Sequence, residues 1–444
     1  MKITNFAAFL NKVKIRIIIR MVKNLKNQLE GSQLFLAIYA SIIIFAVYTC
    51  NYVYRKTFSA ATYSGEEIWG MDAKILFVLF QIIGYCISKF LTVHILPGVK
   101  RDNRVYYILV PLALSELALV GFGAATPSLK PFFILVSALP LGFIYGVVFS
   151  YIEGRRISEI LNVGLCVALV LASGIVKTAG YFIMDTWNVT EYWMPAVTGA
   201  VTFPFLVLFT MMLNLIPKPR EVDVKQRSER RPMSKAEKKD FFQTYRAGIL
   251  FLSFLLVVMA IFREIRDSFA ADIWKELNLE SASIFTATEV PITVFVLGLM
   301  LALVFIRNNE KAVNYIYLTS IVGGAVVLAS TYLFVTDSIS AVWWMVYSGL
   351  GLYMAYLPYT FLLERLIAAL KVQNTAIFII AFTDAFGYLG TMLVFALKNF
   401  IDLDISWTQT LIYVSTISGA LTIVFTILTK IYFSGHIKRA NHEN

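Results

Sequence analysis

Long apolar runs recur along the whole chain and are separated by shorter polar or basic segments. Each run approaches the length of about 20 residues that an α-helix needs to cross the apolar core of a bilayer. Runs such as ILFVLFQIIGYCI do not alternate between apolar and polar side chains, as the strands of a membrane barrel do, so the pattern predicts helices. We predict twelve membrane helices, at residues 34–62, 73–96, 105–124, 130–152, 158–183, 193–216, 247–270, 286–306, 314–335, 341–363, 374–398 and 408–430.

The composition agrees with this prediction and disfavours enzymatic chemistry. Of the 444 residues, 58% are hydrophobic and 15% are charged, which is typical of a polytopic membrane protein. The three cysteines, Cys50, Cys86 and Cys166, lie in apolar runs without metal-ligand spacing, so we expect neither a metal site nor a disulfide. The three histidines are isolated and no P-loop pattern occurs, so we expect no enzyme, no cofactor and no ATP-driven pump.

The polar segments divide the chain into two halves of six predicted helices. A basic segment without apolar periodicity, predicted to be a cytoplasmic linker at 217–246, separates residues 34–216 from residues 247–430. We expect residues 1–33 to form a basic cytoplasmic segment and residues 431–444 to form a cytoplasmic tail. Most of the 39 Lys and Arg residues then lie on the cytoplasmic side, as the positive-inside rule requires. The net charge of +11 therefore needs no nucleic-acid partner to explain it.

The two halves contain similar segments at the ends of their first helices. When YRKTFSAA at 54–61 is aligned with IRDSFAAD at 265–272, Arg55 lies over Arg266 at an offset of 211 residues. This offset is about half of the chain and equates the first helix with the seventh. The halves therefore fit two parallel repeats related by an axis along the membrane normal, which is the arrangement of major facilitator transporters.

Arg55 and Arg266 are cations within apolar runs, where a charge is costly unless it is partnered or faces water. In the predicted fold the two arginines face a central cavity from opposite sides. They would hold an anion between them, because a guanidinium group binds carboxylate or phosphate through two parallel hydrogen bonds. The alternative is that both side chains extend to the headgroup region, together with Lys56. The symmetry of the two positions favours the cavity.

Two segments resemble a known family. NYVYRKTF at 51–58 resembles the first-helix signature of the organophosphate:phosphate antiporters, a branch of the major facilitator superfamily. GYCISKFL at 84–91 resembles the second helix of that family and matches its Ser-Lys-Phe at 88–90. Weaker similarity occurs in two later segments, DIWKEL at 272–277 and TEVPITVFVLG at 288–298.

The resemblance implies an all-α polytopic membrane protein with the major facilitator fold, located in the inner membrane of a bacterium. It implies that Arg55 and Arg266 bind the phosphoryl group of the substrate and that Lys89 lies on the same pathway. Glu289 takes the place of a family glutamate in the eighth helix. The protein would work as a monomer within the lipid bilayer, by alternating access in which the two halves rock against each other.

The chain departs from this family at three places. The fifth-helix histidine has no counterpart here, and the helix carries Lys177, which we expect to face the cavity. The loop TVHILPGVKRDNR lacks part of the usual major facilitator motif. The seventh helix carries both Arg263 and Arg266, one turn apart, so the partner of Arg55 is ambiguous. Inorganic phosphate is therefore less well supported as a substrate than an anionic organic molecule.

Five further residues in apolar runs have both a functional and a structural interpretation. Glu116, Glu289 and Asp384 either take up protons for coupling, since burial favours the protonated carboxyl, or join helices. Tyr353 and Tyr356 of the tenth helix either contact a polyol or sugar or pack against other aromatic side chains.

These features predict a secondary active transporter of an organic anion, such as a sugar phosphate or a sugar acid, coupled to exchange or to protons. The alternative is a transporter-shaped sensor or scaffold that binds a ligand without moving it across the membrane. Charged groups spread over the second, fifth and eighth helices favour transport, because a sensor does not need them. Ligand binding without flux in proteoliposomes would indicate the sensor.

Overall fold

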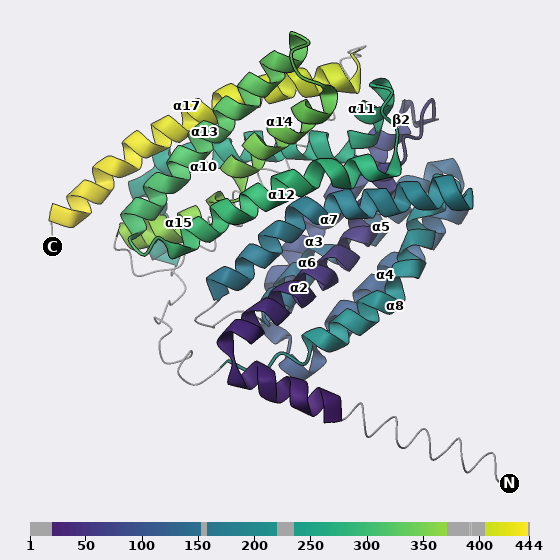
Figure 1. Cartoon of the computed structure of the whole chain (residues 1–444), viewed down its shortest axis with the longest axis horizontal. Helices are drawn as coiled ribbons and strands as arrows, with labels where there is room; N and C mark the ends of the chain where they lie inside the picture. The colour runs from purple at the N-terminus through teal and green to yellow at the C-terminus, as the bar shows by residue number, and fades with distance from the viewer. Residues whose placement is uncertain are drawn as a thin grey trace.

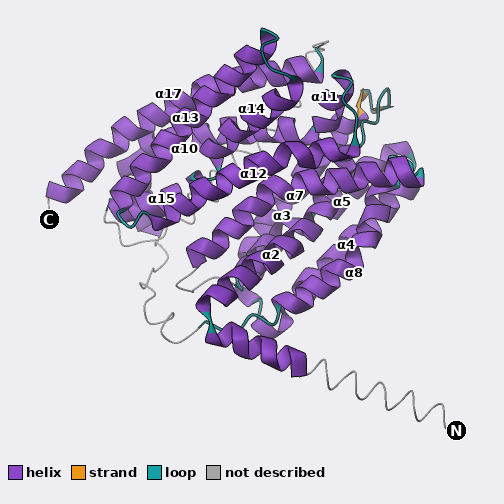
Figure 2. Cartoon of the chain, viewed as in Figure 1, coloured by secondary structure: helices purple, strands orange, loops and turns teal. Residues whose placement is uncertain are grey.

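Nearly all of the described chain is helical. The computed structural model describes residues 20–151, 158–219, 235–370 and 405–442, together with residues 390 and 392. The helices run side by side in two groups, one from each half of the sequence (Figures 1 and 2). The predicted helix at 374–398 lies outside the described residues, apart from 390 and 392.

The N-terminal half begins with a helix at residues 20–31. A 3-10 turn, η1 (Thr57–Ala60), continues the first long helix, and a two-stranded antiparallel hairpin of β1 (Glu67–Ile68) and β2 (Met71–Asp72) leads to the next. The helices of this half are α2 (Gln33–Lys56), α3 (Ala73–Ile95), α4 (Arg104–Ala124), α5 (Lys130–Ala138), α6 (Leu141–Phe149), α7 (Ser158–Trp187) and α8 (Met194–Leu213).

The first helix of the C-terminal half begins inside the segment that was predicted to be a linker, and it bends at Tyr245. The last helix continues through the predicted tail. The helices of this half are α10 (Lys235–Ser268), α11 (Ala270–Glu276), α12 (Ala282–Phe305), α13 (Asn309–Val335), α14 (Ala341–Tyr356), α15 (Tyr359–Ala369) and α17 (Trp407–His442).

Side chains in the loops set where several helices begin. The Ser32 hydroxyl accepts a hydrogen bond from the Phe35 amide (3.2 Å), and the Asp72 carboxylate accepts one from the Ile75 amide (2.9 Å). These bonds satisfy amide groups that lack a partner within the first turn of a helix. The cap at Ser32 separates the helix at 20–31 from α2, and the cap at Asp72 fixes the start of α3.

Two segments that were predicted as single helices are divided in the structure. The segment 130–152 forms α5 and α6, with a turn at Leu139 and Pro140, and the segment 341–363 forms α14 and α15, with a turn at Leu357 and Pro358. Proline lacks the amide hydrogen that a continuous helix needs and crowds the preceding turn. Turns therefore interrupt both predicted segments, although Pro127–Phe149 as a whole is long and apolar enough to cross a membrane.

The described helices have the dimensions and the surface of a multi-pass membrane protein. Ten helical segments are long and apolar enough to cross a membrane. Large apolar side chains are exposed on both halves, which is the surface that lipid requires. Among the most exposed are Ile38, Leu114, Phe205, Val294 and Phe305.

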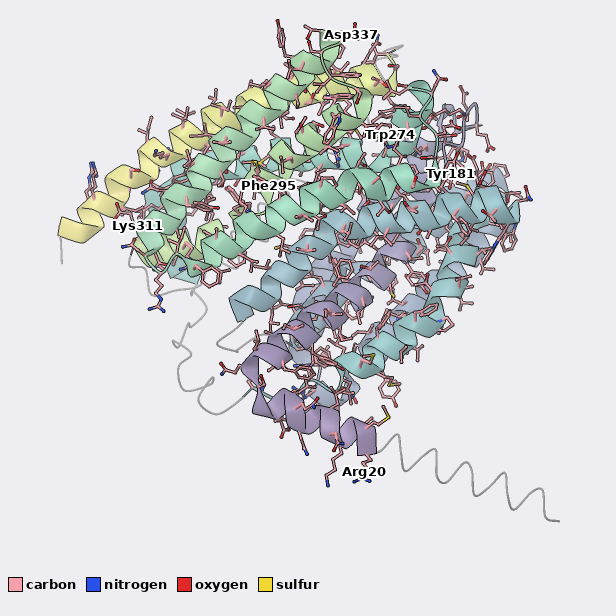
Figure 3. The ribbon with its side chains drawn as sticks, viewed as in Figure 1. Arg20, Tyr181, Trp274, Phe295, Lys311 and Asp337 are labelled. Carbon is pink, nitrogen blue, oxygen red and sulfur yellow. The ribbon has the colours of Figure 1, made fainter. Side chains whose placement is uncertain are left out.

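The two halves contact each other mainly where α7 packs against α12, and η1 packs against α11. The bundle has two ends. Trp274 and Asp337 lie toward the end that carries α11 and the β-hairpin, called the α11 end here, whereas Arg20 and Lys311 lie toward the end that carries α15, called the α15 end (Figures 1 and 3).

Candidate functional site

Lys56, the last residue of α2, reaches across to α10 of the other half. Its ammonium group forms an ion pair with Glu264, donates a hydrogen bond to the Ser268 hydroxyl (2.8 Å) and lies 3.4 Å from a carboxylate oxygen of Asp267. The Lys56 side chain is 2% exposed. A lysine buried to this degree needs such partners, because an isolated charge in a low-dielectric interior is strongly unfavourable.

Asp267 is also held by α7 of the N-terminal half. The Lys177 ammonium pairs with the Asp267 carboxylate and donates to its backbone carbonyl oxygen (2.5 Å), and the Ser173 hydroxyl donates to the same carboxylate. Ser173 and Lys177 are four residues apart and therefore share one face of α7. Lysines of α2 and α7 thus bind the same acidic turn of α10.

A third ion pair lies at the α11 end, where Lys74 of α3 binds Asp272 of α11 at 2.5 Å. In all of these pairs the lysine comes from the N-terminal half and the carboxylate from the C-terminal half. The lysines are Lys56, Lys74 and Lys177, and the carboxylates are those of Glu264, Asp267 and Asp272. We call them the interface lysines and the interface acids.

The described neighbours of Arg55 and Arg266 include residues of their own halves. The Arg55 guanidinium lies over the ring of Tyr85, 4.0 Å from its centroid, and 5.6 Å from that of Tyr52. The Arg266 guanidinium binds Glu289 at 2.7 Å and the carbonyl oxygen of Met345 at 3.0 Å. The contacts described for Arg55 and for Arg266 thus involve different residues.

Arg263 lies on the same side of α10 as the interface. Its guanidinium is 5.3 Å from the ring centroid of Tyr356 and 3.6 Å from the Glu264 carboxylate. The Tyr52 hydroxyl interacts electrostatically with both Arg55 and Arg263, which belong to opposite halves. The sequence did not decide whether Arg263 or Arg266 is the partner of Arg55. Of these two, Arg263 shares the neighbour Tyr52 with Arg55.

Lys89 joins Arg55 in a group of aromatic side chains in the N-terminal half. Its ammonium lies 5.7 Å from the ring of Tyr85 and 5.8 Å from that of Tyr145. Tyr48 contacts both Tyr52 and Tyr145, with ring centroids 5.4 and 5.9 Å apart. These contacts supply cation–π attraction, and the phenol groups are hydrogen-bond donors. The cation–tyrosine cluster comprises Arg55, Lys89, Tyr48, Tyr52, Tyr85 and Tyr145.

The remaining predicted residues fall into three places. Tyr353 is buried and interacts electrostatically with Arg266 and Glu289. Glu116 lies inside the N-terminal half against Gly199, and one of its carboxylate oxygens has no hydrogen-bond partner among the described residues. Asp384 lies outside the described residues.

The interface acids and the role of Lys56 were not identified from the sequence, although the alignment of the two halves pairs Lys56 with an acid. At the offset of 211 residues Lys56 lies over Asp267, and the two contact each other. Ser64 and Lys275 are also 211 residues apart, and the Lys275 ammonium donates to the Ser64 hydroxyl at 3.0 Å. Equivalent positions of two repeats can meet where they lie on the axis that relates them, as residues do at a twofold interface. Opposite charges at equivalent positions were therefore a signal that could have indicated this ion pair.

Comparisons with known proteins give the fold and a family. Solved structures with the same fold include a D-xylose-proton symporter, which superposes with a TM-score of 0.59 at 14% identity over 90% of this chain and 97% of that chain. The nucleoside transporter NupG gives 0.58 at 15% identity over 90% and 99%. A bacterial homologue of the human lysosomal transporter Spinster, in an inward-facing conformation, gives 0.56 at 15% identity over 90% and 97%.

These structures have the major facilitator fold, so the predicted all-helical membrane fold of this type is confirmed, and the number of twelve membrane helices stays a prediction. A family model described as a family of unknown function (DUF5690) matches residues 57–436. No match was found among curated protein sequences.

Proposed function

We propose that this chain, which belongs to the family of unknown function DUF5690 and has the major facilitator fold, is a secondary active transporter of a small organic anion. Proteins of this fold include a symporter and a nucleoside transporter. An identity of 14–15% shows a shared fold and does not indicate a shared substrate. The charges between the halves indicate the class of substrate.

The observation that carries the proposal is the number of cationic side chains gathered in the described interior. The described residues there include six cationic groups and three carboxylates. The cations are Arg55, Lys56, Lys89, Lys177, Arg263 and Arg266, and the carboxylates are those of Glu264, Asp267 and Glu289. Charge removed from water is costly unless it is balanced. A bound anion would be a further partner for these cations.

The arrangement also supports an organic anion such as a sugar phosphate or a sugar acid. Arginine forks bind carboxylate and phosphate groups, and Arg55 and Arg263 lie near a common neighbour, Tyr52. The tyrosines of the cation–tyrosine cluster supply ring faces and hydroxyl groups to the rest of such a molecule. Glu289, which is bound to Arg266, remains a candidate for proton coupling, and exchange is the other form of coupling.

Counterflow in proteoliposomes tests the proposal. Vesicles preloaded with one unlabelled compound are given the same compound in labelled form, using glucose 6-phosphate, glucuronate, phosphate, glucose and uridine in turn. We expect labelled anion to accumulate, with at least about a tenfold lower rate in Arg55→Gln, as expected when one ionic contact is lost. The control Arg307→Gln removes an exposed arginine at the α15 end and should retain the wild-type rate.

Two outcomes would contradict the proposal. Accumulation of glucose or uridine without any anion would place a neutral substrate in the interior. Binding of an anion without flux, in vesicles where orientation and protein content are verified, would favour the sensor over the transporter.

A further inference from the structure

The contact between α3 and α11 closes the α11 end and lies at the edge of the membrane-spanning segments. The neighbouring spans begin at Ala73, end at Ser268 and begin again at Ala282, so Asp272 lies outside them. The Lys74 ammonium donates to the Asp272 carboxylate (2.5 Å) and to the carbonyl oxygens of Ala61 (2.7 Å) and Ser59 (3.3 Å).

Both side chains of this pair are largely removed from water in this structure. The Lys74 side chain is 1% exposed and that of Asp272 is 12% exposed. Lys74 already has two carbonyl acceptors in its own half, whereas Asp272 belongs to the other half. Separation of α11 from η1 and α3 would therefore return the Asp272 carboxyl group to water.

The surroundings of Asp272 favour its neutral form. Burial raises the pKa of Asp272 to about 6, against the opposing effect of the Lys74 ammonium. Asp72 of β2 also raises this pKa, and the Tyr63 hydroxyl lies close enough to interact with the same carboxylate.

The segments packed against α11 add few other ionisable groups. η1 contains none, and the first turns of α17 (residues 407–410) contain none. The last turn of α10 carries Arg266 and Asp267, which are bound to Glu289 and Lys177.

α11 itself also carries Lys275, which donates to the Ser64 hydroxyl of the other half, and Glu276, which binds the start of α17. Asp272 is the acid of α11 that is bound to a lysine of the other half.

The direction of the pH effect follows from the two environments. In water an aspartate has a pKa near 3.9, and in the closed contact the pKa of Asp272 is raised to about 6. The closed state therefore binds the proton more tightly. Protonation therefore stabilises the closed state relative to the open state. This stabilisation is fully present below about pH 4 and is lost as the pH rises through about 6.

We propose that the Lys74–Asp272 contact is a pH-sensitive latch, which holds the α11 end closed more firmly as the pH falls from 7 toward 5. Protons reach Asp272 from the solution at the α11 end, because the group lies outside the spans. The latch therefore regulates one end of the molecule and does not carry a proton through the membrane. Its effect on flux rests on the proposed function, but the latch itself does not.

The latch is tested by measuring the distance between the halves at that end. Ser64 and Lys275 are exposed, lie in opposite halves and contact each other. Spin labels at both positions, in a chain whose three cysteines are replaced by serine, report a short distance when the end is closed and a longer one when it is open. We expect the ratio of closed to open molecules to rise about tenfold between pH 7.5 and pH 5, without any substrate present.

Three variants separate the latch from other causes. Asp272→Asn mimics the protonated acid, so it should show a high closed fraction at both pH values. Lys74→Met removes the cation that lowers the pKa of Asp272, so the midpoint of the transition should move to higher pH. Glu66→Gln is the matched control, because Glu66 binds Tyr192 within its own half and should keep the wild-type pH dependence.

A closed-to-open ratio that does not change with pH, or that falls on acidification, would overturn the latch. So would an Asp272→Asn variant that keeps the wild-type pH dependence. Because the measurement contains no substrate, either result would leave the transport proposal untouched. Failure of the flux experiment would equally leave the latch standing.

Discussion

The Lys56 ammonium donates hydrogen bonds to Glu264 and Ser268 and lies 3.4 Å from a carboxylate oxygen of Asp267. We expect Lys56→Met to lower the free energy of unfolding by about 3–5 kcal/mol, because Glu264 is then left buried without its main cation. Thermal or denaturant unfolding in detergent measures this change.

The double variant Lys56→Met/Glu264→Met provides the control at the same site. Removal of both charges should recover most of the lost stability, since a buried ion pair replaced by apolar side chains is often neutral. If the double variant is as unstable as Lys56→Met, or if Lys56→Met has wild-type stability, the ion pair does not contribute as described.

The sequence located the interior cations better than it located their partners. Arg55, Lys89 and Lys177 were identified because each is a charge in an apolar run. Their contacts depend on which way each helix turns, and a difference of one turn separates Arg263 from Arg266. Lys56 was considered only as a side chain that extends to the headgroup region. Its alignment with Asp267 indicates a contact only when the position of the axis between the halves is known.

At the scale of elements, α7 and α12 hold the halves together through close packing. A Cβ atom added at Gly174 of α7 would lie 2.7 Å from the carbonyl oxygen of Phe285 and 3.0 Å from Cγ of Glu289 on α12. Close to this point the hydroxyls of Thr178 and Thr286 form a hydrogen bond of 2.7 Å. Small residues allow such close approach of membrane helices.

Gly174→Ala should therefore force α7 and α12 apart and lower stability by about 1–3 kcal/mol, as overpacking does. Gly298→Ala on α12 is the matched control, because nothing lies within 4 Å of its added Cβ. It should be neutral or slightly stabilising, since alanine favours helix more than glycine does. Equal melting temperatures for the two variants would contradict the close packing.

A second prediction concerns how α11 orders the start of α17. The Glu276 carboxylate accepts hydrogen bonds from the amides of Trp407 and Thr408, both at 2.7 Å, and from the Thr408 hydroxyl at 2.6 Å. It thus acts as a cap supplied by another helix. We expect Glu276→Ala to lower stability by about 1 kcal/mol, in the range of other N-cap losses.

Hydrogen exchange of the first amides of α17 measures this effect locally. Faster exchange at Trp407 and Thr408 in Glu276→Ala, with unchanged exchange in α13, is the expected pattern. Unchanged exchange at the start of α17 would show that the cap is not needed.

The elements themselves were largely predictable from apolar run length, because a bilayer fixes how long a crossing helix must be. The exceptions have local causes. Pro140 and Pro358 divide predicted helices, and the polar start of α10 at Lys235 is helical although it lacks apolar periodicity. Contacts within the fold stabilise such segments, and the sequence pattern alone does not record them.

At the scale of the whole molecule, the two halves are joined by ion pairs whose charges are divided between them. The N-terminal half contributes the interface lysines and the C-terminal half contributes the interface acids. Electrostatic attraction therefore favours the joined arrangement, and a change of conformation must separate these charges or supply new partners for them. An anion bound near the lysines and arginines would be such a partner.

Binding of anions to the purified protein is the most direct test of this account. Thermal unfolding is measured with glucose 6-phosphate, glucuronate, phosphate or glucose, for the wild type, Arg55→Gln and the control Arg307→Gln. A ligand at 100 times its Kd should stabilise the protein by about 2.7 kcal/mol. The account predicts that at least one anion raises the melting temperature of the wild type and of Arg307→Gln but not that of Arg55→Gln. A response to glucose alone, or an equal response of Arg55→Gln to the anion, would contradict it.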